Sequence, residues 1–413
     1  MKKKIVVLLG ANQYLRERAL AGARQCTQAE IWIADPAAIK NKNRYFDGSL
    51  LANPYDVEKI IKEIELLKDR ELASVIPLND WVLESANRVN AHFGLPALSD
   101  KTIVRARNKY EMKLAFLEHG VPAANYYLLS KDEELLAAIT HVGLPAIIKP
   151  YDFGGSGGVF VAHTYDEAVK YLAESRTLIS SNRKAFKIQG DKYLVEEYIN
   201  STDEVSVEVI CFKGKYKTIT VTEKYLSPEP WFSEIGHLVP SFRHENNEVR
   251  LLAEKACESL GIEFGLAHVE IKIRDSKLYV IEAAARPGGD GIMDQVEAAF
   301  GINPYALHIG AYLGVDTTEV NIPSPRGTAA IAFLKAKEGV ISGIEDIDCS
   351  ELDQSISSLK ITTEVGKISE PPKNWSAREG VVEFFWPDYF ESKKTLLPIK
   401  NAQNLSEKIF KVE

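Results

Sequence analysis

Cysteine is scarce in this sequence, with four residues among 413. Cys26, Cys211, Cys257 and Cys349 stand far apart and show none of the paired spacings of zinc sites. Cysteines so few and so scattered argue against a disulfide-stapled secreted scaffold and a structural zinc site. We therefore expect reduced thiols in a cytoplasmic protein.

Long apolar runs and an excess of positive charge are also missing. No apolar stretch reaches the roughly 18 residues of a membrane helix. The start, three lysines and then the short run 5–9, looks only briefly like a signal peptide, because charged residues follow Gly10 closely. Lysine and arginine number 50 against 58 aspartates and glutamates, for a net charge of −8 and a pI near 5.7. We expect neither a membrane nor a nucleic acid as partner.

What is present is an ordinary globular composition, 45% hydrophobic and 26% charged, in a chain long enough for two or three domains. The apolar runs 5–9, 31–33 and 74–78 alternate with helical patterns, which predicts βαβ units on a parallel sheet. Gly10 follows the first run without the spacing of a dinucleotide-binding loop.

Beyond residue 100 the pattern becomes mixed, and we predict an α/β (α+β) protein. One or two helices over 100–120 end at Gly120, and a helix over 248–260 ends at Gly261. Strands are expected at 146–150, 193–199, 204–212 and 217–222, and short strands after Pro323 suggest a cap. The predicted domains are 1–100, 101–200, 201–315 and 316–413.

Two glutamates, Glu270 and Glu282, flank a probable β-hairpin of apolar and β-branched residues. Carboxylates in an apolar sheet repel each other and lose hydration, and Mg²⁺ removes that conflict. With Asp275, Ser276 and Lys277 as a three-residue turn, the glutamates become cross-strand partners on one face; a two-residue turn puts them on opposite faces. The alternative is an acidic hairpin whose glutamates reach solvent.

A glycine-rich segment follows Lys149 at the end of a predicted strand. Glycine allows close approach of the backbone to a ligand, and successive N–H groups can bind an anion. The lysine precedes the glycines, so this is not a Walker motif, and a flexible hairpin tip is the alternative. The candidate phosphate-binding residues are Lys149, Gly154, Gly155, Ser156, Gly157 and Gly158.

The segment Glu196-Glu197-Tyr198-Ile199, with Glu204 five residues on, suits a nucleotide hinge. A strand edge offers a carbonyl and an N–H to an adenine edge, and a carboxylate accepts hydrogen bonds from ribose hydroxyls. An edge strand with surface glutamates is the alternative.

The order of these motifs, from Lys109 through the hinge to Arg286, resembles the ATP-grasp superfamily over roughly residues 1–315. The resemblance implies an N-terminal parallel βαβ domain, a mobile lid, a central antiparallel-sheet domain and a C-terminal cap. It implies that Lys109 and Lys149 contact ATP phosphates and that Glu204 binds ribose. Glu197 and Ile199 would hold adenine through backbone atoms, with Glu196 nearby by side chain. Glu270 and Glu282 would hold Mg²⁺, and Arg286 would steady the transferring phosphoryl group.

The motif around Arg286 departs from many superfamily members, because Ala284 stands where an asparagine is common. This form looks like the L-amino acid ligase (dipeptide synthetase) branch and leaves occupancy of a second Mg²⁺ open. Glu234 and His237 also look like that branch, which places a Glu-x-x-His pair near the amino acid substrates. A loop with two surface polar groups is the alternative.

Three further residues are candidate substrate contacts. Asp290 follows two glycines and is expected to face the acceptor pocket, where it would favour a polar or cationic amine; a helix N-cap is the alternative. Gly289 precedes it, and His268 would lie opposite Ala284 in the three-residue register.

The resemblance implies an ADP-forming carboxylate–amine ligase that makes an amide bond through an acylphosphate. Its cofactors would be ATP and one or two Mg²⁺ ions, with Mn²⁺ as a substitute, and Arg286, Lys149 and Glu282 would carry the chemistry. The substrates would be amino acids or small carboxylic acids, and a homodimer is a reasonable expectation. The alternatives are a biotin-carboxylase-like or purine-pathway ligase, and a nucleotide-binding regulatory module without turnover.

Overall fold

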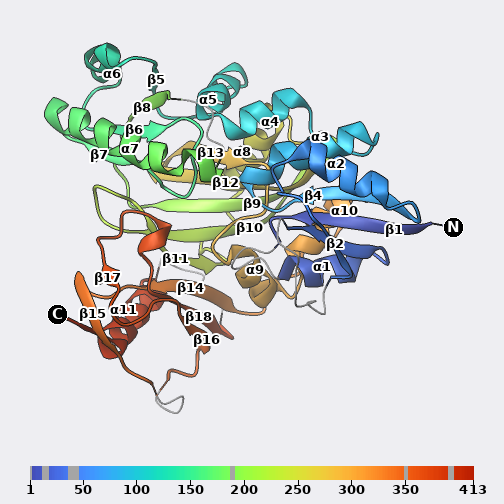
Figure 1. Ribbon diagram of the computed structural model, residues 1–413. Helices are drawn as coiled ribbons and strands as arrows, with labels where there is room; N and C mark the ends of the chain where they lie inside the picture. The colour runs from blue at the N-terminus through green and yellow to red at the C-terminus, as the bar shows by residue number, and fades with distance from the viewer. Residues whose placement is uncertain (1, 12–17, 36–45, 187–190, 348–351, 389–394) are drawn as a thin grey trace.

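The computed structural model describes residues 2–11, 18–35, 46–186, 191–347, 352–388 and 395–413. These residues form four sheets with helices packed around them (Figure 1). No helix among them combines the length and the apolar character needed to cross a membrane. Cys26, Cys211 and Cys257 are free thiols, and Cys349 lies outside the described residues.

The N-terminal sheet is parallel throughout, in the order β3-β2-β1-β4, as predicted from the three apolar runs. Residues 5–9 of its central strand are fully buried, since helices cover both faces of such a sheet. The strands are β1 Lys3–Leu9, β2 Glu30–Ala34, β3 Gly48–Leu50 and β4 Arg70–Pro77. The helices are α1 Arg18–Cys26, α2 Val57–Leu66, the 3₁₀ turn Asp80–Val82 and α3 Leu83–His92.

Two short helices, α4 Asp100–Arg107 and α5 Lys109–Glu118, connect this sheet to the next. Asn108 separates them, because its extended backbone ends α4 and its side chain accepts hydrogen bonds from the N–H groups of Tyr110 and Glu111. Lys109 is therefore the first residue of α5, and its position is set by the cap.

The small antiparallel sheet has the order β5-β8-β6-β7. Its strands are β5 Tyr126–Leu129, β6 Ala146–Pro150, β7 Phe160–Ala162 and β8 Tyr193–Glu197. The 3₁₀ turn Asp132–Glu134, α6 Leu135–Val142 and α7 Tyr165–Phe186 accompany it. The glycine-rich segment joins β6 to β7. β8 pairs on both sides, which excludes the alternative of an edge strand with surface glutamates.

The large sheet has eight strands in the order β13-β12-β9-β10-β11-β14-β18-β16. They are β9 Glu204–Phe212, β10 Lys215–Leu226, β11 Glu234–Val239, β12 Phe264–Arg274, β13 Lys277–Ala284, β14 Thr328–Leu334, β16 Ile356–Ile361 and β18 Gly380–Trp386. Helices α8 Asn247–Leu260, α9 Ile292–Phe300 and α10 Pro304–Tyr312 pack against it. α8 ends at Gly261 in the left-handed conformation, as predicted.

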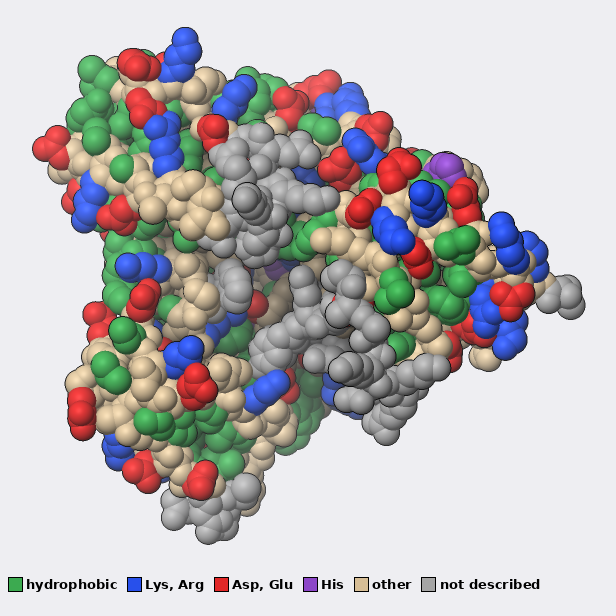
Figure 2. Space-filling model, viewed as in Figure 1, with side chains coloured by type: hydrophobic (Ala, Val, Ile, Leu, Met, Phe, Trp, Pro, Cys, Tyr) green, Lys and Arg blue, Asp and Glu red, His purple; other side chains and the backbone are tan. Residues whose placement is uncertain are grey.

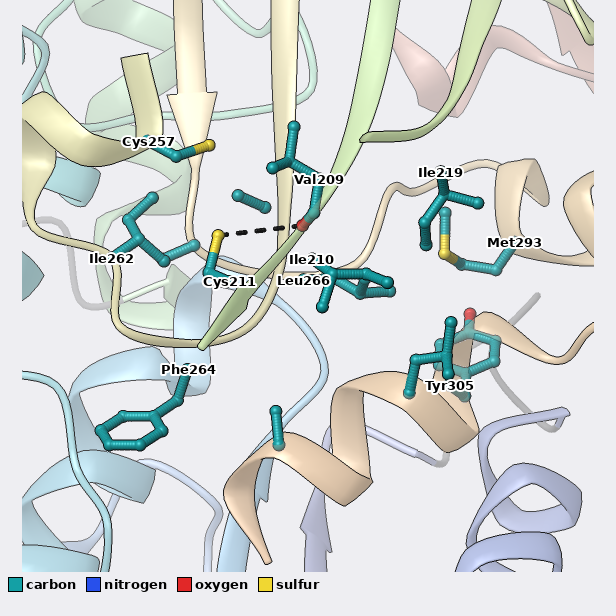
Figure 3. Packing of buried hydrophobic residues seen from close by; sticks show 14 of the residues in the cluster. Val209, Ile210, Cys211, Ile219, Cys257, Ile262, Phe264, Leu266, Met293 and Tyr305 are labelled. Atoms are coloured by element: carbon teal, nitrogen blue, oxygen red, sulfur yellow. Dashed lines mark hydrogen bonds between the residues drawn. The ribbon is translucent and has the colours of Figure 1, made fainter. Parts of the chain in front are cut away.

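The main core lies between this sheet and the helices. Figure 3 shows Ile210 and Leu266 of the sheet on the side of Met293 and Tyr305, which come from helices α9 and α10. The same cluster continues into the N-terminal sheet through Val6 and Leu8, among others. The N-terminal and central parts thus share one buried core.

The C-terminal part continues the large sheet, because β14 pairs with β11. A three-stranded sheet of β15 Gly339–Ile344, β17 Ile368–Ser369 and β19 Phe410–Val412 lies beside it with α11 Leu397–Ile409. Two 3₁₀ turns, Thr317–Glu319 and Trp375–Ala377, complete the described elements. The boundary at residue 316 stays a prediction, and the sheet is continuous across it.

The hairpin of β12 and β13 has the predicted partners but a different turn. Glu270 pairs with Glu282, which confirms the predicted register. The loop, however, has two residues, because Arg274 already pairs with Lys277. A β-bulge restores the register: Ile271 pairs with Val280, so Ile281 is an extra residue. The predicted three-residue loop is wrong.

The two loop residues explain this turn. Asp275 and Ser276 have φ angles of 51° and 61°. Positive φ at both positions gives the turn whose twist matches that of the flanking strands.

Ser276→Gly should therefore stabilise the protein, since glycine adopts positive φ without steric cost. We expect the free energy of unfolding to rise by roughly 0.5 to 1 kcal/mol in urea denaturation. Ser358→Gly, in strand β16 at a position without positive φ, is the control and should lower it by a similar amount. Equal losses in both variants would contradict the turn assignment.

Candidate active site

A cavity lies where the small sheet, the large sheet and the N-terminal part meet, on the hollowed face visible in Figure 2. Seventeen of the twenty predicted site residues line it. The exceptions are Gly157 and Gly158, in the glycine-rich segment, and His237, which is fully buried behind Glu234. The residues expected to bind ATP, metal and substrate thus share one space.

Lys224 lines the cavity and forms ion pairs with three glutamates. Its Nζ lies 2.8 Å from carboxylate oxygens of Glu204, Glu234 and Glu270, and the lysine side chain is 2% exposed. Burial acts to lower the pKa of Lys224, but the three carboxylates raise it well above its usual value. The ammonium is therefore charged and compensates carboxylates from three strands.

Lys224 was not predicted from the sequence. The available signal was the adjacent pair Glu223 and Lys224 within a β-branched strand. Charges in such a strand need partners, but the partners lie on three other strands and no local pattern identifies them.

The predicted metal pair is solvent-accessible and flanked by cations. The side chains of Glu270 and Glu282 are 22% and 29% exposed, and Glu282 accepts a hydrogen bond of 3.0 Å from Lys109. His268 Nδ1 lies 2.5 Å from Glu208, and its Nε2 lies 3.5 Å from Glu270. Burial alone would lower the pKa of His268, but Glu208 raises it to about 9.

These two carboxylates fit Mg²⁺ only in company with ligand oxygens. No group of three or more metal-ligating side chains occurs among the described residues. Mg²⁺ commonly takes one or two carboxylates and completes its shell with phosphate oxygens and water. The pair is therefore suited to a nucleotide-bound ion, which agrees with Ala284 in place of a third ligand.

Lys149 and Lys113 share one buried carboxylate. Lys149 Nζ lies 2.9 Å and Lys113 Nζ 3.5 Å from Glu196 Oε1. Burial lowers the pKa of Lys113 to about 8, and the two lysines hold the pKa of Glu196 below its usual value against the effect of burial. Glu196 is 3% exposed, so it is not a surface residue of an edge strand.

The glycine-rich segment divides into two halves. A Cβ on Gly157 would meet the Phe153 ring at 2.2 Å, and one on Gly158 would meet Ser175 Oγ at 2.5 Å. Gly154 has no neighbour within 4 Å of such a Cβ, and it lines the cavity. The last two glycines are thus required for packing, whereas the first leaves room for a ligand.

The hinge has one free backbone donor. The N–H groups of Glu197 and Tyr198 donate to Asn125 O and Pro145 O. Among the described residues, the N–H of Ile199 makes no hydrogen bond. It is therefore available to a ligand in the cavity.

Arg286 is held by a residue of the N-terminal part. Its Nε donates to Asp80 Oδ2 at 2.8 Å. Asp80 follows β4, at the carboxyl end of a parallel strand, where ligands of α/β sheets bind. That position was a usable sequence signal for Asp80, which was not predicted.

Glu234 and Asp290 line the cavity together with Arg378 from the C-terminal part. Arg378 Nη2 donates to Asp290 Oδ2 at 2.8 Å and to the Glu234 carbonyl at 3.1 Å. The N-cap of α9 is Gly291 without a side-chain bond, which excludes the N-cap alternative for Asp290. Arg378 stands in a turn before β18, and nothing in its local sequence marks it as functional.

Comparison with known proteins agrees with this arrangement. A sequence profile of the ATP-grasp domain matches residues 142–310. This chain contains an ATP-grasp domain. The match begins before β6 and ends in α10, so it includes the glycine-rich segment, the hinge, both metal-site glutamates and Arg286.

The chain with this ATP-grasp domain is similar to several ligases. The alanine–anticapsin ligase of Bacillus amyloliquefaciens is 25% identical over 60% of this chain, but the match covers only 55% of that ligase. The L-arginine-specific L-amino acid ligase of Bacillus subtilis is 22% identical over 76% of this chain and 75% of its own length. The crystal structure of L-amino acid ligase from Bacillus licheniformis matches with a TM-score of 0.81 at 17% identity, covering 100% of this chain and 99% of that chain.

The prediction of an ATP-grasp fold with L-amino acid ligase-like character is confirmed at the level of fold and similarity. The roles of the individual site residues stay predictions.

Lys224→Met should strongly destabilise the fold, because it leaves three carboxylates together without their shared cation. We expect a loss of about 3–5 kcal/mol in the free energy of unfolding, measured by urea denaturation. Lys215→Met is the matched control: this lysine is on the same strand and also contacts two carboxylates, but it is 58% exposed. Its loss should cost far less, because an exposed ion pair contributes little to stability. Similar costs for the two variants would refute the role of Lys224.

Proposed function

We propose that this protein is an ATP-dependent, ADP-forming carboxylate–amine ligase that joins an amino acid to a second amino acid or small carboxylic acid. The observation that carries the proposal is the shared cavity. It contains the carboxylate pair Glu270 and Glu282 beside Lys109, and next to them Glu234, which shares the Lys224 ammonium with Glu270. A site for phosphates and a site for ammonium groups thus adjoin each other.

The lysines of the cavity suit a polyphosphate. We propose that Lys109 and Lys149 contact ATP phosphates and that the N–H of Ile199 binds adenine, with Glu204 near the ribose. In the absence of phosphate each lysine contacts a carboxylate, Glu282 or Glu196. When bound through Glu270 and Glu282, Mg²⁺ supplies charge neutralisation of the phosphate oxygens.

Arg286 suits the phosphoryl group in transfer. Asp80 holds its guanidinium in place, and both Asp80 and Glu282 favour its charged form, so its pKa stays above the usual value despite burial. The terminal phosphoryl group passes from ATP to the donor carboxylate, which gives an acylphosphate and ADP. The acceptor amine then attacks the carbonyl carbon, phosphate leaves, and the amine nitrogen loses a proton to give the amide.

Glu234 suits the donor ammonium. Lys224 and His237 hold the pKa of Glu234 well below its usual value, although burial acts to raise it, so the carboxylate is charged. His237 Nε2 lies 3.1 Å from Glu234 and is fully buried. We propose that Glu234 contacts the substrate and that His237 positions Glu234 from behind.

We also propose that residues 101–200 form a lid and 316–413 a cap, with the nucleotide between the small and large sheets. A closed lid would keep water from the acylphosphate.

The products distinguish this chemistry from its alternatives. With pooled amino acids, ATP and MgCl₂, we expect ADP and phosphate in a one-to-one ratio with a new amide, detected by mass spectrometry, and no AMP. With hydroxylamine as the amine, the donor should yield a hydroxamate, because an acylphosphate reacts with small nucleophiles. Bicarbonate-dependent ADP release without amide would favour a biotin-carboxylase-like enzyme. Nucleotide binding with no ADP under any condition would favour a regulatory module.

Glu282→Gln should keep the fold and remove most turnover, because it removes one of two carboxylate charges from the proposed Mg²⁺ site. We expect ADP release to fall at least about a hundredfold, the scale seen when a group that stabilises transition-state charge is removed. Asp275→Asn, at the tip of the same hairpin, is the control and should retain full activity. Wild-type rates in Glu282→Gln at saturating MgCl₂ would exclude the metal assignment.

A further inference from the structure

Six cations line the cavity: Lys109, Lys149, Lys224, Lys272, Arg286 and Arg378. The first five lie among the groups proposed for ATP and Mg²⁺. Lys272 lies over the rings of Tyr198 and Phe232, beside the hinge. Arg378 alone of the six comes from the C-terminal part and lies with the substrate-facing residues Glu234 and Asp290. It therefore needs a separate explanation.

The contacts of Arg378 fix its position and leave donors free. Its guanidinium carbon lies 3.5 Å from the centroid of the Phe333 ring, and Nη2 donates to both Asp290 and the Glu234 carbonyl. Nε is buried without a hydrogen-bond partner among the described residues. Nη1 makes no hydrogen bond among them either and is not buried in this way. A stacked guanidinium with an unused N–H at a cavity wall is suited to bind a carboxylate.

The chemistry of the ligase reaction assigns that carboxylate. The donor must present its own carboxylate to the phosphoryl group near Arg286. The charged group of the donor that is left for recognition is therefore its ammonium, and Glu234 is suited to bind it. The acceptor must present its amine to the acylphosphate. If the acceptor is an amino acid, the charged group left for recognition is its carboxylate. Binding of that carboxylate requires a cation that the phosphates do not occupy.

From this geometry we infer that Arg378 binds the carboxylate of the acceptor, which makes the acceptor an α-amino acid, not a simple amine. The inference rests on the proposed function. Asp290 holds the guanidinium in place through its ion pair. In this arrangement Arg378 compensates the charge of Asp290, and the predicted preference for a polar or cationic acceptor would not come from Asp290 alone.

The test compares an acceptor amino acid with its amide, which lacks the negative charge. For the wild-type protein we expect the amide to have a KM about ten- to a hundredfold higher, the value of a hydrogen-bonded charge. Arg378→Gln keeps a donor for Asp290 and the Glu234 carbonyl. It should raise the KM of the amino acid by this factor, leave that of the amide unchanged, and leave the KM values of ATP and donor within about twofold.

The controls separate this role from a structural one. Arg326→Ala removes a guanidinium that is exposed and bonds the Ala298 carbonyl, and it should leave the ratio of amino acid to amide unchanged. Arg378→Lys keeps the charge and should recover part of the discrimination. An unchanged ratio in Arg378→Gln, or equal losses for both acceptors, would overturn the inference while the ligase assignment stands. A wild-type protein that forms no amide with any amino acid would overturn both.

Discussion

The ion pairs of the Lys224 ammonium with three glutamates are the interaction on which this cavity depends. Glu204 on β9, Glu234 on β11 and Glu270 on β12 contact it from strands adjacent to one another or to β10. Without this cation three charges would lie together in a largely buried space, and burial of unpaired charge is strongly unfavourable. The proposed ribose, amino acid and metal sites therefore share one counterion, and a change in charge at one of them alters the balance at the other two.

Much of the fold could be predicted from the sequence because its signals are local. The apolar runs 5–9 and 74–78 became parallel strands, and Gly261 ended α8. The hairpin partners were also predicted correctly, since two carboxylates in an apolar strand pair strongly restrict the register. The turn was wrong because the compensating bulge at Ile281 has no sequence signature; it is evident only once both strands are aligned.

The candidate site was predictable where its residues belong to motifs and not where they depend on tertiary pairing. Lys149 and the glycine-rich segment are contiguous, and a contiguous pattern can be read directly. Lys224 and Arg378 act through partners that lie between 10 and 144 residues away, and no local sequence pattern indicates that proximity. The same reason explains the hinge: β8 carries an edge-like pattern, but it is the tertiary pairing with β5 and β6 that places it inside a sheet.

The continuity of the large sheet has a mechanical consequence. Backbone hydrogen bonds between β11 and β14, and between β14 and β18, tie the turn that carries Arg378 to the strand that carries Glu234. Outward movement of that wall would break these backbone hydrogen bonds, whereas in the described part of the chain the small sheet makes no strand pairs with the large sheet. If residues 101–200 form the proposed lid, admission and release of reactants would occur at the wall that carries the glycine-rich segment, while the wall that carries Arg378 would stay in place. Substitutions in the segment between the 3₁₀ turn and β18 would accordingly change the proposed acceptor contact and leave the proposed lid unchanged.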